Sequence, residues 1–278
     1  MNNHPFSNSI QSVRFNSNGF HARQIKDGIP TATTSQEKLP GFDQERLRNA
    51  RIHLIGCGGI GGAILECLVR KGCGHVDVFD ADTVELGNLG RQKFFPEDVG
   101  KNKAICGARN ALRHASWPTE IIAHPVWFED AVYQGVVGGA DAVIVGPDRD
   151  STRLYASRYY YNACPVITVG IGALAEHGYV FVQKPGSACF ACVFPESVAN
   201  KRQPCPGTPA MVDILMATGA LVLTALDSIL MKGRSINWNY WDIYPSGAIP
   251  TQPLMIERKT DCPICGKMNV NSGKGGVA

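Results

Sequence analysis

The stretch RIHLIGCGGIGG at residues 51–62 decides the fold of this chain. Its first six residues are an apolar run typical of a buried strand, and a helical pattern of apolar residues follows from Ile60 to Lys71. The glycines between the two elements allow a tight turn, and they let a phosphate group approach the amide N–H groups at the start of the helix. Strand, glycine loop and helix together predict the first unit of a nucleotide-binding α/β domain.

Strands and helices alternate outward from this unit. Predicted strands cover residues 75–80, 121–126, 141–146 and 165–171, and predicted helices cover 103–114 and 151–161. This alternation predicts an α/β fold, with a Rossmann-like, mostly parallel sheet and helices on both faces. Two further strands, at 178–184 and 237–244, are expected as an antiparallel extension at one edge.

The composition limits the class of protein and its surroundings. The 278 residues carry 27 basic and 24 acidic side chains, a balance that does not indicate a nucleic-acid partner. The N-terminus has no apolar signal segment, so the ten cysteines are expected as thiols or metal ligands in the cytoplasm. The apolar segment 211–231 contains Asp213 and Asp227, which favours a core or dimer-interface helix over a membrane span.

The ends of the chain lack periodic patterns. Residues 1–45 are rich in Asn, Ser, Thr and Pro, and we expect them to form an irregular N-terminal arm. A single domain is expected over residues 46–266, with a loop rich in Pro and Gly at 201–208. Residues 267–278 are expected to be a flexible tail.

Polar residues follow the strands of the predicted sheet. Asp80 ends the second strand, where a carboxylate can accept hydrogen bonds from ribose hydroxyls. Asn88 and Arg91 come just beyond it, Lys103 opens the next helix, and Asp148 follows a later strand. Cationic side chains match phosphate oxygens and a carboxylate can hold Mg²⁺. This set favours a nucleoside triphosphate as the ligand.

Two other classes of function stay open from the residues alone. An NAD(P)-dependent oxidoreductase would also use the glycine loop and Asp80, although Arg91, Lys103 and Asp148 would then have no role. A non-catalytic partner subunit is the second alternative, and the presence of those three residues argues against it.

The run 51–62, the stretch DVFDADTVELGNLGRQ at 77–92 and VGKNK at 99–103 resemble the ThiF/MoeB/HesA family, relatives of the ubiquitin-activating enzymes. The resemblance extends from about residue 23 to residue 266. It implies ATP- and Mg²⁺-dependent adenylation of the C-terminal carboxylate of a small ubiquitin-like or sulfur-carrier protein or peptide, usually ending in Gly-Gly. It also implies a homodimer and, in some members, transfer of the activated carboxylate to a thiol.

The same resemblance implies which residues form the site. The nucleotide-binding set comprises Gly56, Gly58, Gly59, Gly61, Asp80, Asp82, Asn88, Arg91, Gln92, Lys103 and Asp148. Within this set Arg91 and Lys103 would bind phosphates during catalysis, and Asp148 would bind Mg²⁺. Arg149 follows Asp148, whereas the family usually has Thr-Asp-Asn there.

Arg23 resembles the family's early arginine, which reaches the ATP of the partner subunit. Here the segment between Arg23 and the start of the domain is longer than the family pattern, so a simple surface arginine is the alternative.

The cysteines suggest two further sites. Cys189, Cys192, Cys262 and Cys265 form two C-x-x-C pairs, a spacing typical of a structural Zn²⁺ site, with a redox pair as the alternative. Cys205 lies in the loop 201–208, near the position where some family members carry a reactive cysteine. Pro, Gly and Thr follow it instead of the usual Glu-Ala-Gly, so a catalytic thiol and an unreactive loop thiol both stay open.

Overall fold

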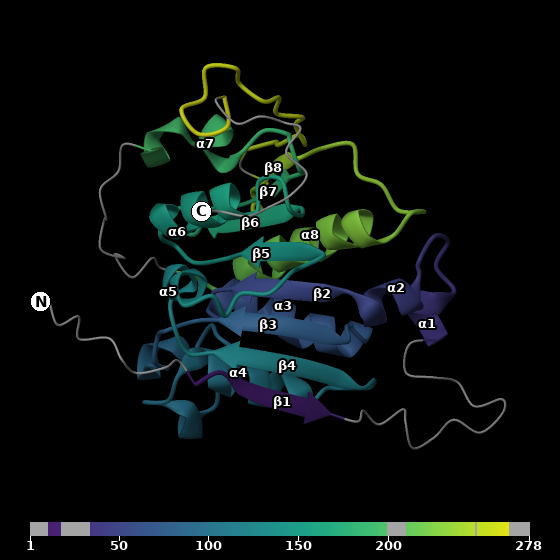
Figure 1. The fold of residues 1–278 in the computed structure, drawn as a ribbon, viewed down its shortest axis with the longest axis vertical. Coiled ribbons are helices and arrows are strands. Elements are labelled where there is room, and N and C mark those ends of the chain that lie inside the picture. Colours follow the sequence, from purple (N-terminus) through teal and green to yellow (C-terminus); the bar gives the residue numbers. More distant parts are fainter. Residues whose placement is uncertain (1–10, 18–33, 199–209, 248, 267–278) are drawn as a thin grey trace, which may run out of the picture.

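The computed structural model describes residues 11–17, 34–198, 210–247 and 249–266. These residues form one eight-stranded sheet with the order β1-β4-β3-β2-β5-β6-β7-β8 (Figure 1). The strands are β1 (Val13–Ser17), β2 (Arg51–Ile55), β3 (His75–Phe79), β4 (Thr119–His124), β5 (Ala142–Val145), β6 (Val166–Ile171), β7 (Gly178–Gln183) and β8 (Tyr240–Ile243). The five strands from β4 to β6 in this order are parallel, and β1, β7 and β8 add antiparallel pairs at the two edges. The predicted α/β fold class is confirmed.

Successive side chains along each strand point to opposite faces of the sheet, and each face packs in its own apolar layer. On one face, Ile52 and Leu54 pack with α3 (Gly59–Lys71), α4 (Lys103–Leu112) and α8 (Val212–Leu230). The other face packs against α5 (Phe128–Tyr133) and α6 (Asp150–Tyr159). The shorter helices are α1 (Thr34–Glu37), α2 (Gln44–Asn49) and α7 (Phe190–Val193), with single turns of 3₁₀-helix at Leu86–Asn88, Pro96–Asp98 and Pro195–Val198. Helices therefore cover both faces of the sheet, as the sequence predicts.

Helix α8 is long and apolar enough to cross a membrane by length and composition. In this fold it packs along α3 and against β5, β6 and β7, and Val222, Ala225 and Leu226 on that side are buried. A helix that buries one face against the sheet of its own domain is a core helix, which agrees with the sequence interpretation.

The N-terminal region differs from the sequence interpretation. β1 lies inside the segment expected to be an irregular arm, and it pairs antiparallel with β4. Its five residues alternate only between half-buried and exposed positions, so the local pattern is weak. This strand is defined by its pairing with β4 at the edge of the sheet. The hydrogen bond between Ser12 Oγ and His124 Nδ1 (2.8 Å) supports that pairing. The expectation of an irregular arm was therefore wrong for residues 13–17.

Candidate functional site

The glycine loop joins β2 to α3 through a turn that needs glycine. Gly56 has φ of +88°, a conformation that other residues rarely adopt. A Cβ on Gly61 would lie 2.0 Å from the carbonyl oxygen of Gly56, so α3 packs directly on the turn. A Cβ on Gly58 would meet nothing within 4 Å, and no side chain caps the helix that Gly58 starts. The first turn of α3 is thus open to a ligand.

A cavity of about 630 Å³ lies beyond this loop, and we call it the main cavity. It occupies the carboxyl ends of β2, β3 and β5, where the strand order reverses and where open α/β sheets bind ligands. Its lining includes most of the residues predicted for the site, namely Gly56, Gly58, Gly59, Asp80, Asp82, Asn88, Arg91, Gln92, Lys103 and Asp148. Gly61 does not line it and acts through packing, while Arg23 and Cys205 lie outside the described residues.

Asp80 is buried at the base of the main cavity. Its Oδ2 accepts a hydrogen bond from the backbone N–H of Cys57 (2.6 Å), and its Oδ1 accepts one from the N–H of Asp82 (2.9 Å). Burial raises the pKa of Asp80 to about 6, although the two N–H donors oppose that rise. The carboxylate therefore ties the glycine loop to the end of β3, and its remaining lone pairs are available to ribose hydroxyls.

The cations of the main cavity are held in place by neighbouring groups. Lys103 Nζ lies 3.0 Å from Asp82 Oδ2, with only 12% of the lysine side chain exposed. Arg91 donates from Nη1 to the carbonyl oxygen of Gly87 (2.7 Å). Asn88 is buried, and its Oδ1 accepts the N–H of Glu85 (3.0 Å). These contacts position both cations beside the glycine loop, where phosphate oxygens would be bound.

Arg153 also lines the main cavity, although no sequence motif pointed to it. Only 9% of this residue is exposed, and it donates to Asp150 Oδ1 (3.0 Å) and to the carbonyl oxygen of Val169 (3.4 Å). Its Nε is buried and has no hydrogen-bond partner within the part of the chain that the structure describes. In a sequence, a lone arginine usually indicates a solvated charge. Arg153, however, lies in the first turn of the helix after β5, and this position could have predicted its place at the cavity.

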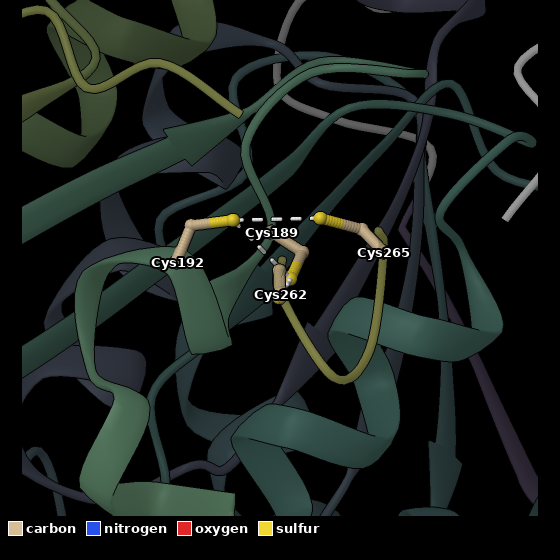
Figure 2. A group of neighbouring side chains, drawn as sticks. All are labelled: Cys189, Cys192, Cys262 and Cys265. Atoms are coloured by element: carbon tan, nitrogen blue, oxygen red, sulfur yellow. Dashed lines mark hydrogen bonds between the residues drawn. The ribbon is translucent and has the colours of Figure 1, made fainter. Parts of the chain in front are cut away.

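The four predicted zinc ligands come together where α7 meets the segment 262–265 (Figure 2). All four sulfur atoms lie within 4.8 Å of one another, with distances of 3.6 Å for Cys189–Cys262 and 3.4 Å for Cys192–Cys265. Four sulfurs at about 2.3 Å from one ion would be about 3.8 Å apart, whereas a disulfide needs about 2.05 Å. The cysteine cluster therefore fits a tetrahedral metal site.

The surroundings of the cysteine cluster shift the pKa values of its thiols in different directions: burial raises the pKa of Cys189 and of Cys192, whereas local hydrogen-bond donors lower that of Cys262. All four residues are buried, and the N–H of Lys259 donates to Cys192 Sγ (3.5 Å). Burial by itself would raise the pKa of Cys262, but the N–H groups of Cys265 and Ile264 and the neighbouring thiols lower it to about 7. A thiol whose pKa lies near 7 is partly ionised at neutral pH, and the thiolate is the form that binds a metal.

Comparison with known proteins identifies the family of this chain. The model of the ThiF family matches residues 23–264, which is most of the chain. The chain belongs to the ThiF family. Among relatives of this ThiF-family protein is the sulfur carrier protein adenylyltransferase of Thermus thermophilus, 28% identical over 80% of this chain and 84% of the relative. Another is the SAMP-activating enzyme E1 of Haloferax volcanii, 28% identical over 82% of this chain and 85% of the relative.

A solved structure shows the same fold. The crystal structure of E. coli MccB with ATP superposes with a TM-score of 0.65 and 24% identity, over 80% of this chain and 68% of MccB. The ThiF family and the named relatives are adenylyltransferases that activate ubiquitin-like or sulfur-carrier proteins.

Proposed function

We propose that this protein is an ATP- and Mg²⁺-dependent adenylyltransferase. Its acyl substrate is the C-terminal carboxylate of a small ubiquitin-like or sulfur-carrier protein, or of a peptide, that ends in Gly-Gly. The observation that carries the proposal is the main cavity of a ThiF-family chain, in which the glycine loop, Asp80, Arg91 and Lys103 line one space. An NAD(P)-dependent oxidoreductase would leave the two cations without a task.

The proposed reaction is attack of the substrate carboxylate on the α-phosphorus of ATP, with pyrophosphate leaving. The carboxylate is already ionised at neutral pH, so the site needs to align the reactants and stabilise negative charge rather than supply a base. Arg91 and Lys103 stabilise charge on the phosphate oxygens. Asp148 lines the same cavity and supplies an oxygen ligand of the kind Mg²⁺ prefers.

Zn²⁺ is the ion we propose for the cysteine cluster. Four buried thiols at tetrahedral spacing suit zinc, and such closed sites are structural rather than catalytic. The ion would join residues 262–265 to the segment 189–192. None of these cysteines lines the main cavity, which supports a structural task.

A cytoplasmic homodimer without nucleic-acid or membrane partners completes the proposal. In such a dimer Arg23 would reach the nucleotide of the partner subunit, and Cys205 would accept the activated carboxylate. The support for this part is the family pattern alone. Native mass spectrometry tests the dimer, and trapping of a thioester in wild type but not in Cys205→Ser tests the thiol.

The function is tested by ATP–pyrophosphate exchange with a panel of small proteins ending in Gly-Gly. We expect exchange of labelled pyrophosphate into ATP that requires Mg²⁺ and one of these proteins. Lys103→Ala and Asp148→Ala should each lower the rate about 100-fold. Lys232→Ala, an exposed lysine outside the main cavity, is the matched control.

Two outcomes would refute the proposal. One is tight binding of NAD⁺ without any ATP-dependent exchange, which would favour the oxidoreductase. The other is an Asp148→Ala variant that leaves the activity of a larger complex unchanged, which would favour a non-catalytic partner subunit.

A further inference from the structure

A serine, a histidine and an aspartate lie in one row near the edge of the sheet, and we call them the edge triad. Ser12 precedes β1, His124 ends β4 and Asp77 lies in β3. The pairing of Val13 with Ala123, continued by one residue, places Ser12 opposite His124. The three residues are distant in the sequence, so only the sheet brings them together.

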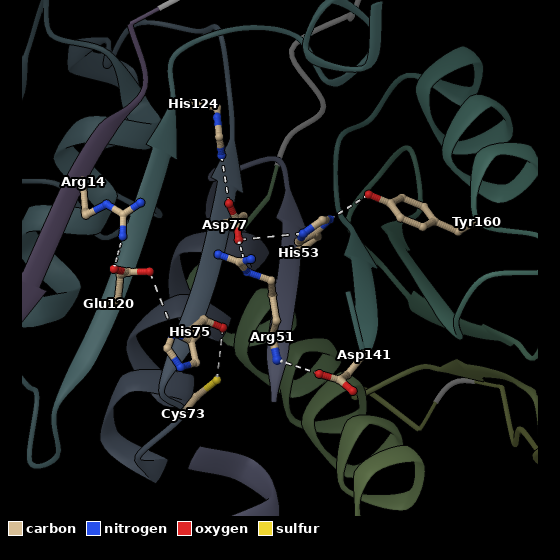
Figure 3. Close-up of polar contacts among 10 residues, drawn as sticks. All are labelled: Arg14, Arg51, His53, Cys73, His75, Asp77, Glu120, His124, Asp141 and Tyr160. Carbon is tan, nitrogen blue, oxygen red and sulfur yellow. Dashed lines mark hydrogen bonds and ion pairs between the residues drawn. The ribbon is translucent and has the colours of Figure 1, made fainter. Parts of the chain in front are cut away.

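Two hydrogen bonds connect the edge triad. Ser12 Oγ lies 2.8 Å from His124 Nδ1. His124 Nε2 lies 3.0 Å from Asp77 Oδ1 (Figure 3). At these separations a base can accept the proton of a hydroxyl nucleophile while a carboxylate orients the base. The two ring nitrogens exchange their roles relative to serine hydrolases, in which Nε2 contacts the serine.

The charge of Asp77 determines which ring nitrogen carries the proton. Burial by itself would raise the pKa of Asp77, but the hydrogen bond from His124 and the charges of His53 and Arg51 keep it below its ordinary value. Arg51 Nε lies 3.0 Å from Asp77 Oδ2. The ionised carboxylate accepts the N–H at His124 Nε2, so the lone pair of Nδ1 faces the Ser12 hydroxyl.

The base of the edge triad is buried and fixed, while its hydroxyl is open to solvent. The His124 ring stacks on Phe79 with the ring centres 4.4 Å apart and the planes at 6°, and only 3% of His124 is exposed. Ser12 itself is exposed. Among the described strands β1 is the last in the sheet order, so the N–H groups on its outer side face no further strand. Such N–H groups are donors of the kind that stabilise an oxyanion.

From this geometry we infer that Ser12 is an activated nucleophile that takes acyl groups from activated donors such as aryl esters, thioesters and anhydrides. The Ser12 oxygen attacks the carbonyl carbon while its proton passes to His124 Nδ1. A C–O bond to Ser12 forms, the bond to the leaving group breaks, and the leaving group departs with the electron pair as an anion. His124 then releases the proton to water.

The burial of His124 limits the class of donor. An amine leaves a carbonyl carbon only after it receives a proton, and the buried ring lies behind Ser12, so amides are poor donors. Activated donors need no such proton. Ser12 does not line the main cavity, so the inference does not depend on the binding of ATP there.

The nucleophile is tested by treating the full chain with p-nitrophenyl acetate and mapping acetylated peptides by mass spectrometry. We expect acetylation of Ser12, while Ser151, an exposed serine elsewhere in the chain, stays unmodified. Ser12→Ala should lose the p-nitrophenolate released by this reaction. Ser12→Cys should restore it, because a thiol at the same position can give its proton to the same base.

The base is tested by His124→Gln, which should lower the rate of acetylation at Ser12 about 100-fold near neutral pH. The loss should shrink at high pH, where hydroxide removes the proton instead of the ring, whereas a distorted fold would lose the reaction at every pH. Asp77→Asn should show the same profile, because its amide can donate to Nε2 and leave the ring proton on Nδ1. The matched control is His114→Gln, at a histidine that contacts Arg70 and should not affect the rate.

Two outcomes would overturn the inference. One is a wild-type chain in which Ser12 is modified no faster than Ser151. The other is a folded His124→Gln protein, with a cooperative thermal melt, in which Ser12 reacts at the wild-type rate. The first comparison uses the wild type alone, so it decides the matter even if a variant at the buried histidine fails to fold.

Discussion

At the scale of a single residue, Asp80 is a lining group of the main cavity whose charge depends on pH near neutrality. Burial raises its pKa to about 6, so the carboxyl group changes charge just below neutral pH. The ionised form can accept two ribose hydroxyls, while the protonated form loses part of that capacity. The group that we propose to bind the ribose is thus fully ionised only well above its pKa.

We predict that adenosine, which has no phosphate group to titrate, binds more weakly as the pH falls from about 7.5 to about 5. The affinity should be constant above the pKa of Asp80 and fall by up to about tenfold per pH unit below it. Calorimetric titration at a series of pH values measures this. An affinity that stays constant over the whole range would contradict the role of Asp80.

His53 belongs to a buried polar chain on the α6 side of the sheet (Figure 3). Its Nδ1 lies 2.7 Å from the Tyr160 hydroxyl, and its Nε2 lies 3.8 Å from Asp77 Oδ2. Asp77 also binds Arg51 Nε (3.0 Å) and His124 Nε2 (3.0 Å). Burial lowers the pKa of His53 to about 4, although the charge of Asp77 opposes this shift.

Folding stability should therefore fall as the pH decreases from about 6.5 to about 4. In this range the unfolded chain binds a proton at His53 that the folded chain does not, so acid favours unfolding by up to about 3 kcal/mol. We expect His53→Phe to have a shallower pH dependence in urea denaturation. His75→Phe, which removes an exposed histidine, should keep the wild-type slope. Equal slopes in all three proteins would refute this role.

At the scale of elements, the junction of β2 and α3 assigns different tasks to neighbouring glycines. Gly61 lets the helix contact the Gly56 carbonyl, while Gly58 leaves open space at the main cavity. The first task concerns packing and the second concerns ligand access.

Two alanine variants should separate these tasks. Gly61→Ala places a Cβ into the Gly56 oxygen, so we expect a loss of about 2 kcal/mol or more in the free energy of unfolding. Gly58→Ala should keep the wild-type melting temperature but raise the Kd for ATP about tenfold, because the methyl group enters the nucleotide space. Thermal melts and calorimetry on both variants measure this. A Gly58→Ala protein with normal ATP affinity would contradict the predicted position of the phosphates.

At the scale of the whole molecule, the cysteine cluster joins the C-terminal segment to the body of the domain. Cys262 and Cys265 share a buried cluster with Tyr161 and Phe181, and Ile256 packs against it. Few other contacts are needed to hold such a segment once a metal binds it.

Removing the ion should weaken the fold without closing the main cavity. We expect one Zn²⁺ per chain by elemental analysis, and its loss in Cys262→Ser. The melting temperature should fall by about 10 °C. The affinity for ATP below that temperature should stay near the wild-type value, because no cluster residue lines the main cavity. Cys67→Ser, at a cysteine outside the cluster, is the control. A chain that binds no zinc, or melts unchanged without it, would contradict the structural site.

The sequence by itself determined the elements whose signals are local. Apolar runs such as Ala142–Val145, the glycine loop and the C-x-x-C spacings can be recognised from neighbouring residues, because strand pleat, turn geometry and ligand spacing act over a few positions. The polar positions Asp80 and Lys103 were predictable for the same reason, since each directly follows or opens a regular element.

Only the tertiary structure decided the features that depend on distant segments. β1 exists because β4 offers an open edge, and Arg153 faces the main cavity because α6 packs on the sheet. The stack of Arg149 on Trp127 brings together residues that follow different strands. Such contacts leave no periodic trace in the chain, because their free energy arises from burial and pairing that exist only after the sheet has formed.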